Sequence, residues 1–266
     1  MRKTAGVPRG TSSRVADRVA AELRRRIVEG ELADGDSLPK QDDIIREFDV
    51  SRPSAREALR ILEAEGLLTV RRGGTGGSVV HLPQPEGIAY TMALALRSQD
   101  TTLGDIGVAL QQLEPLCASL CAMRPDRGTA VLPGLRAAQD DLAAAIDADD
   151  QPAGSLASRR FHEQLVATCG NDALALMAGA VESLWTTQQQ DWAQRAVAAR
   201  VFPERALREH AWNEHEEILG AIAAGDTDAV VTSATAHLVQ AQRFPLAGGD
   251  PPVSGLPLAE YRDRRP

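Results

Sequence analysis

The chain has 266 residues, of which 43% are hydrophobic and 25% charged, and its formal net charge is −8. This length suggests one or two domains with a proper hydrophobic core, and the composition is ordinary for a soluble globular protein. The first residues, MRKTAGVPRG, lack the apolar stretch of a secretory signal, and no apolar run approaches the roughly 20 residues of a membrane span. We therefore expect a cytoplasmic protein with no membrane partner.

The three cysteines, Cys117, Cys121 and Cys169, form no CxxC pair. Their odd number and apolar surroundings favour small buried side chains in a reducing compartment over a disulfide or metal role.

The charge is distributed unevenly along the chain. Residues 1–82 hold 15 Lys/Arg and 13 Asp/Glu, a balance of +2, whereas residues 83–266 hold 14 and 24, a balance of −10. An acidic total does not exclude nucleic acid as a partner, because binding depends on the local field at the contact surface.

The first 82 residues predict three helices followed by two strands. Residues 1–13 are basic and rich in Gly, Pro and Ser, so we expect a flexible terminus. Apolar residues recur every four positions from Val15 to Ile27, which predicts an amphipathic helix ending near Gly30. A second, shorter helix is predicted at about residues 41–48.

The stretch SRPSAREALR predicts a third helix with a basic face. Ser51 suits the N-cap and Pro53 the first turn, where a missing N–H costs little. Arg52, Arg56 and Arg60 recur every four residues and would share one face.

The β-prone pieces LLTV and SVVHL flank the glycine-rich RRGGTGG, which indicates a hairpin. The order helix, helix, helix, strand, strand predicts a winged helix-turn-helix domain over residues 14–82.

A helix of this kind fits the major groove of double-stranded DNA, and arginine can pair with guanine or grip phosphate. Arg52 and Arg56 sit where reach to bases is best, Arg60 suits the backbone, and Ser51 and Ser54 can donate to phosphates. In the hairpin, Arg71 and Arg72 precede glycines and could enter the minor groove. The alternative is that the arginines only form a solvated helix face with no role in DNA binding. The surrounding pattern of helix, turn and wing favours DNA binding over this alternative.

The segment from Leu23 to Val80 resembles the N-terminal domain of the GntR family of bacterial transcription regulators, through VSR..AREAL..LEAEGLL and RRGGTGG..V. The resemblance implies DNA contacts from Arg52 and Arg56, with Ser51, Pro53 and Ser54 beside them, and from Arg72 and Gly73 in the wing.

One position departs from that pattern. Many members have arginine at the start of the second helix, where this chain has Asp42. A carboxylate repels the DNA backbone, although it could accept from a cytosine amino group or order Arg46, and Lys40 could supply some of the missing charge.

The rest of the chain predicts an all-helical domain. After a linker at 83–86, residues 87–243 form an antiparallel bundle of about seven helices, followed by a flexible Pro/Gly-rich tail at 244–266. The predicted helices are 87–98, 103–123, 129–147, 153–169, 171–195, 204–224 and 226–243. The expected fold class is therefore mainly α, with a small β-wing.

Three histidines, His162, His215 and His237, lie on apolar faces of three separate predicted helices. One inward histidine is usually a satisfied core residue, but three together can hold a divalent metal and leave coordination positions open for an anionic ligand.

Residues 86–243 resemble the all-helical FCD effector domain of the FadR subfamily of GntR regulators. The matching pieces are LE at 113–114, FH and GN between 161 and 171, EH..IL.AI..GD at 214–226, and a histidine 22 residues after His215. The resemblance implies a divalent metal bound by an Asp and these three histidines. Ser158 stands where the Asp normally lies, so the site could be weaker or vestigial, and the protein could be metal-free. Zinc is the favoured ion, with nickel or manganese as alternatives.

The same resemblance implies an effector pocket. Leu110 stands where many members have an arginine that clamps an effector carboxylate, which makes a more apolar or acyl-type ligand thinkable. Trp185 and Trp192, with Gln188 and Gln189 between them, could line the pocket or belong to an ordinary core. The predicted pocket residues are Leu110, Glu114, Asn171, Trp185 and Gln188.

These patterns predict a homodimeric transcription regulator, more often a repressor in this family, that binds a pseudo-palindromic operator and responds to a small-molecule effector, such as an organic acid. The alternatives are a metal-sensing regulator, a constitutive DNA-binding protein and, remotely, a zinc-dependent hydrolase. Against the last, the chain has no HExxH, no phosphate loop and no nucleophile elbow.

Overall fold

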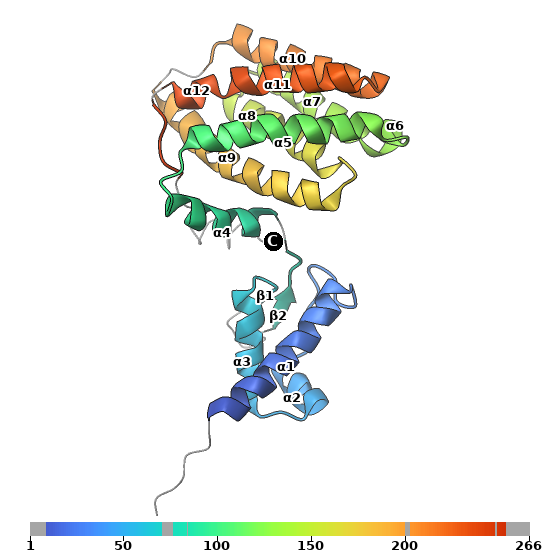
Figure 1. Ribbon diagram of the computed structural model, residues 1–266, viewed down its shortest axis with the longest axis vertical. Coiled ribbons are helices and arrows are strands. Elements are labelled where there is room, and N and C mark those ends of the chain that lie inside the picture. Colours follow the sequence, from blue (N-terminus) through green and yellow to red (C-terminus); the bar gives the residue numbers. More distant parts are fainter. Residues whose placement is uncertain (1–8, 71–76, 84, 200–202, 248, 254–266) are drawn as a thin grey trace, which may run out of the picture. The chain divides into compact units, whose positions relative to one another are not determined.

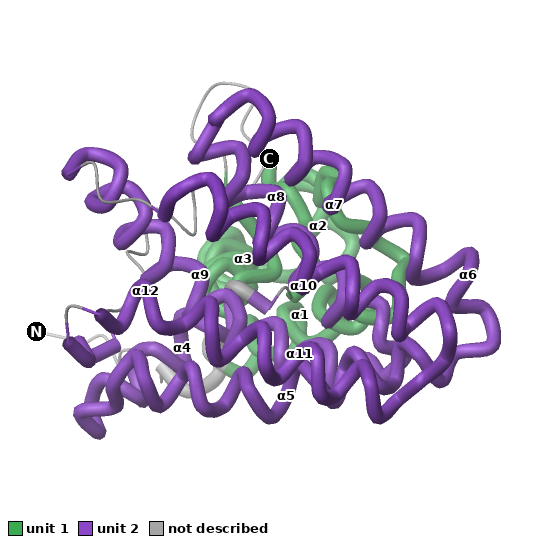
Figure 2. Tube along the Cα trace, turned by 90° about the horizontal axis from the view of Figure 1, so that it is seen from above, with its two compact units in different colours: residues 1–83 green, residues 84–266 purple. Residues whose placement is uncertain are grey.

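The computed structural model describes residues 9–70, 77–83, 85–199, 203–247 and 249–253 (Figure 1). The chain divides into two compact units, residues 1–83 and residues 84–266, which Figure 2 distinguishes by colour.

The first unit is a winged helix-turn-helix. Its elements are α1 (Arg9–Val28), α2 (Gln41–Phe48), α3 (Arg52–Ala64), β1 (Leu68–Val70) and β2 (Ser78–Val80). The strands pair antiparallel with Leu68 opposite Val80. The predicted wing residues Arg71, Arg72 and Gly73 lie outside the described residues.

The apolar face predicted for the first helix forms the core of this unit. Leu23 and Ile27 of α1 are fully buried and pack with Ile44 of α2, Leu62 of α3 and Val80 of β2. Helix α1 begins at Arg9, inside the stretch that we expected to be flexible.

The second unit is an α-helical bundle, as the sequence predicts. Its helices are α4 (Pro85–Arg97), α5 (Leu103–Met123), α6 (Arg127–Ala130), α7 (Leu132–Asp147), α8 (Gln151–Ala167), α9 (Asp172–Ala198), α10 (Arg205–Ala224), α11 (Thr227–Ala241) and α12 (Arg243–Leu246). Side chains cap several N-termini; Thr102 and Asp105 form a reciprocal capping box on α5.

Helix α5 packs against α8, α9, α10 and α11, and in Figure 1 it runs through the body of the bundle. By length and composition alone α5 could cross a membrane, but half of its most apolar 18-residue stretch is buried inside the protein. Its Cys117 and Cys121 are free and buried, as is Cys169, in agreement with the sequence prediction.

The C-terminal segment differs from the flexible tail predicted from residue 244. Residues 242–253, which we call the C-terminal strap, dock on the start of α5 as far as they are described. Asp250 Oδ1 accepts from the Gly104 N–H at 2.7 Å, and the Leu103 N–H donates to the Pro251 carbonyl at 2.8 Å. Val253 is 1% exposed. The strap is therefore part of the folded unit, because hydrogen bonds and apolar burial fix its backbone.

Glycine at position 107 makes room for the strap. Gln242 is 3% exposed; its Nε2 donates to the Gly107 carbonyl at 3.1 Å, and its Oε1 accepts from Gln111 at 2.6 Å. A Cβ at position 107 would lie 2.8 Å from Gln242 Oε1 and 3.3 Å from the Trp185 ring.

We predict that Gly107→Ala destabilises the protein whereas Gly220→Ala stabilises it. Both glycines are inside helices, where Ala is favoured by roughly 0.5–1 kcal/mol. Nothing lies within 4 Å of a Cβ at position 220, but the methyl group at 107 must displace Gln242. Urea unfolding of both variants measures the difference. Equal stabilisation of the two would show that Gln242 does not hold the strap against α5.

Candidate functional site

Helix α3 presents the predicted basic face to solvent. Ser51 caps the helix, its hydroxyl accepting from the Ser54 N–H at 3.3 Å, and Pro53 lies in the first turn. Arg52, Arg56 and Arg60 are all exposed. The local sequence therefore folds as expected, with the arginines opposite the buried Ala55, Leu59 and Leu62.

Two of these arginines form ion pairs with nearby carboxylates. The side chain of Arg52 donates from Nη2 to Asp42 Oδ1 at 2.8 Å, and Arg60 lies 3.6 Å from Glu57. Arg56 makes no ion pair within the described chain. Asp42 does not order Arg46, which pairs with Asp43 instead.

The other predicted DNA contacts fall into two groups. Lys40 and Pro53 are exposed at the starts of α2 and α3. Ser54 is only 4% exposed and its hydroxyl lies 2.9 Å from that of Ser51, so this side chain serves the helix cap and is withdrawn from the surface.

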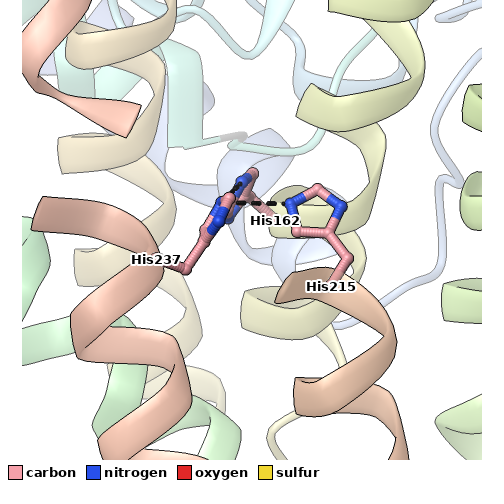
Figure 3. Close-up of side chains that lie close together, drawn as sticks. All are labelled: His162, His215 and His237. Carbon is pink, nitrogen blue, oxygen red and sulfur yellow. Dashed lines mark hydrogen bonds between the residues drawn. The ribbon is translucent and has the colours of Figure 1, made fainter. Parts of the chain in front are cut away.

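The three predicted histidines converge in the helical unit. His162 comes from α8, His215 from α10 and His237 from α11, and their rings point toward one another (Figure 3). The Nε2 atoms of His215 and His237 are 3.1 Å apart, and those of His237 and His162 are 3.4 Å apart. Two nitrogens bound about 2.1 Å from one zinc ion lie at about this separation. The cluster could therefore hold a metal ion.

Each histidine is held through its other ring nitrogen. Nδ1 of His162 lies 2.6 Å from Glu114 Oε1, that of His237 lies 2.9 Å from Glu214 Oε2, and that of His215 lies 3.3 Å from Gln139 Oε1. The ring of Phe161 stacks on His215 at 4.1 Å. Such partners orient metal-binding imidazoles and leave Nε2 free as the ligand atom.

The surroundings shift the pKa values of these groups in different directions. Burial alone lowers the pKa of His162, but the charge and hydrogen bond of Glu114 more than offset it, and the pKa rises to about 9. Burial lowers the pKa of His215 and His237. A metal bound here would displace a proton from His162 at neutral pH, because only the unprotonated nitrogen is a ligand.

A cavity of about 620 Å³ lies beside the cluster and is bounded by residues of α7 to α12. His162, His237 and Ser158 all line it. Ser158 precedes His162 by one helical turn, so it faces the same cavity from α8.

A buried carboxylate that the sequence reasoning missed also lines this cavity. Glu182 on α9 is 5% exposed and accepts from the Thr186 hydroxyl at 3.1 Å. Burial raises its pKa to about 7, and the charge of Glu114 acts in the same direction. Its surroundings in the sequence, AVESLW, gave no sign of an inward acidic residue.

The predicted pocket residues separate in the structure. Trp185 lines the cavity, together with Gln189 and Trp192. Glu114 is 1% exposed and holds His162 instead of bounding the cavity.

Leu110, Asn171 and Gln188 do not line this cavity. Leu110 is fully buried in the core with α4 and α9, and the Asn171 side chain caps α9 by accepting from the Leu174 N–H. Gln188 is half-buried on α9, next to the lining residues Gln189 and Gln190.

Two further residues that hold the histidines were not predicted. For Glu214 the sequence does contain a signal, because this residue directly precedes His215 in the EH motif. For Gln139 the sequence contains no such signal, since nothing in an amphipathic helix indicates which residue a glutamine will contact.

Two known families match the two units. Residues 15–77 match the family described as bacterial regulatory proteins, gntR family, and residues 105–240 match the FCD domain. The second match alone covers half of the chain.

Several known proteins are similar to this chain over most of its length. The HTH-type transcriptional regulator LutR of Bacillus subtilis is 29% identical over 217 residues, which cover 81% of this chain and 94% of LutR. The Exu regulon transcriptional regulator of Escherichia coli K12 is 26% identical, covering 85% of this chain and 82% of that protein. The solved structure of a Streptococcus agalactiae GntR protein covers 86% of this chain and 99% of its own, with a TM-score of 0.63 and 23% identity, and so supports the fold.

We predict that Ser158→Asp tightens Zn²⁺ binding by at least about tenfold, because a carboxylate would add a fourth, anionic ligand to three neutral imidazoles. His237→Ala should nearly abolish binding. Isothermal titration calorimetry of the full-length protein measures both effects.

Ser155→Asp and His210→Ala are the matched controls. Ser155 lines the same cavity one turn before Ser158, and His210 is exposed on the helix that carries His215. If Ser155→Asp tightened binding as much as Ser158→Asp, the gain would be a general effect of charge.

Proposed function

Because the chain belongs to the GntR family and carries an FCD domain, we propose that this transcription regulator is a homodimeric, ligand-responsive repressor of a pseudo-palindromic operator. It is not an enzyme: its domains and relatives are those of transcription regulators.

The observation that carries the DNA-reading part is the exposed arginine face of α3. A capped helix whose first turns project Arg52 and Arg56 matches the way in which helix-turn-helix proteins reach base edges in the major groove. Arg56 carries an unpaired charge within the described chain, which makes it the best candidate for a bidentate contact with guanine.

The ligand-responsive part rests on the cavity beside the histidine cluster. A cavity of about 620 Å³, mostly apolar with a few buried polar groups, is typical of small-molecule sites. An effector there would act by binding more tightly to one dimer arrangement, so that the spacing of the two reading helices changes.

A divalent ion, with zinc favoured, would be held by His162, His215 and His237 and would supply a positive charge to the cavity. The imidazoles are oriented by hydrogen bonds at Nδ1, which favours metal binding. Ser158 would give a lower affinity for the metal than an Asp at the same position. The same cluster supports a second candidate function, in which the ion itself is the signal.

We predict that Arg56→Ala lowers affinity for the operator about 10- to 100-fold without changing the oligomeric state, since one well-placed arginine–guanine contact contributes about 1–3 kcal/mol of discrimination. The operator is obtained by selection from random duplex DNA, and binding is followed by fluorescence anisotropy.

Arg25→Ala is the control, because it removes one exposed arginine of the same unit that pairs with glutamates of its own segment. Unchanged operator affinity of Arg56→Ala would refute the role of α3. A response of wild-type operator affinity to Zn²⁺ alone, with no organic ligand active, would favour the metal sensor.

We predict that Asp42→Asn tightens nonspecific DNA binding about two- to fivefold and steepens its salt dependence. The substitution removes a negative charge and releases Arg52 from an exposed ion pair, which is worth at most about 1 kcal/mol. Asp43→Asn is the control, since Asp43 pairs with Arg46 on α2. An equal effect of the two variants would remove any special role for the Asp42–Arg52 pair.

A further inference from the structure

Two arginines in the cavity wall have hydrogen-bond donors without partners. Arg159 on α8 and Arg208 on α10 both line the cavity, with side chains 21% and 13% exposed. The Nε–H group of each is buried and makes no hydrogen bond within the described chain. A buried donor without an acceptor is costly, and in a native protein it commonly marks a group that a ligand satisfies.

The two guanidinium groups are otherwise held by carboxylates at the surface. Arg208 pairs through Nη2 with Asp149, and Nε of Arg159 lies 3.4 Å from Glu163 Oε1 in an ion pair without hydrogen-bond geometry. Both carboxylates are well exposed, so solvent screens them and they only partly neutralise the arginines. The two arginines therefore keep positive charge in the cavity wall.

The cavity wall also holds a carboxyl group, which affects where the anionic end of a ligand can lie. Glu182 on α9 is buried, and its ionised form repels an anion from that side. The remaining lining is largely apolar and includes Trp185, Trp192, Leu238 and Phe244. An anionic group is thus directed to α8 and α10, and an apolar body of the same ligand is accommodated by aromatic and aliphatic side chains.

We propose that Arg159 and Arg208 form an anion subsite, separate from the histidine cluster, that binds the carboxylate of an amphipathic effector. Each arginine has one buried Nε–H that makes no hydrogen bond within the described chain, and a carboxylate has an oxygen for each. The inference rests on the proposed ligand-responsive function and specifies the chemistry of its ligand.

Titration calorimetry of the full-length protein with three probes of equal chain length tests the subsite: decanoate, 1-decanol and decylamine. Decanoate should bind at least about tenfold more tightly than the other two. Arg159→Gln and Arg208→Gln should each lower decanoate affinity about tenfold and leave 1-decanol unchanged, because a charge-assisted hydrogen bond is lost. If either variant fails to fold, Arg159→Lys or Arg208→Lys keeps the charge, lacks the Nε–H, and should still weaken decanoate.

The controls are Arg160→Gln and Arg205→Gln, exposed arginines of the same two helices that pair with Asp141 and Asp147. Equal loss in these controls, tighter binding of decylamine, or no decanoate binding would overturn the subsite. Loss of decanoate binding on chelation of metal would also overturn it, by placing the carboxylate on the ion. Operator binding without any probe is measured separately, so failure of the subsite leaves the DNA-reading function standing.

Discussion

Burial of ionisable side chains at the centre of the helical unit is the constraint on which the rest of this unit depends. His162, His215, His237, Glu114 and Glu182 are all at most 9% exposed, and burying such groups costs free energy unless they are paired. Glu114 and Glu214 hold two of the imidazoles by charge, and Gln139 holds the third by its amide. The three partners lie on α5, α7 and α10, and the histidines lie on α8, α10 and α11. These hydrogen bonds therefore also help to specify how the five helices pack together.

A different electrostatic constraint applies to the winged helix-turn-helix unit. Its arginines must be free enough to meet DNA, yet the chain is acidic overall. Surface pairs such as Asp42–Arg52 are weak, at about 0–1 kcal/mol, and can exchange their carboxylate for phosphate or guanine. If the arginines contact DNA as proposed, such pairs restrain them in the free protein without preventing the contact. The buried Ser54, in contrast, is committed to the helix cap.

The sequence predicted the fold class from local periodicity. The apolar helix faces, together with the resemblance to the FCD domain, predicted that the three histidines on separate helices share one site. Prediction failed where the outcome depends on contacts between distant segments. The tail is Pro/Gly-rich, yet Asp250 and Val253 dock on α5 through contacts with residues about 150 positions earlier. Leu110 was assigned to the pocket from the family resemblance, but in the structure it belongs to a core cluster with residues of α4 and α9. Arg159 and Arg208 carry no motif, and the sequence gives no sign that both line the same cavity.

Packing gives the cavity a physical connection to the helix that follows the DNA-reading unit. Trp185 lines the cavity and also belongs to the core cluster that contains Ala89 and Ala93 of α4 and Val253 of the strap. Close-packed cores transmit displacement because they have few voids to absorb it. A ligand that pushes Trp185 toward this core must therefore shift α4, the strap or both. Since a ligand changes an equilibrium only by its difference in affinity for two states, regulation requires that the occupied cavity favour one packing of α4 over another. The side chains against Trp185, and not the histidines alone, then determine how strongly a bound effector can act.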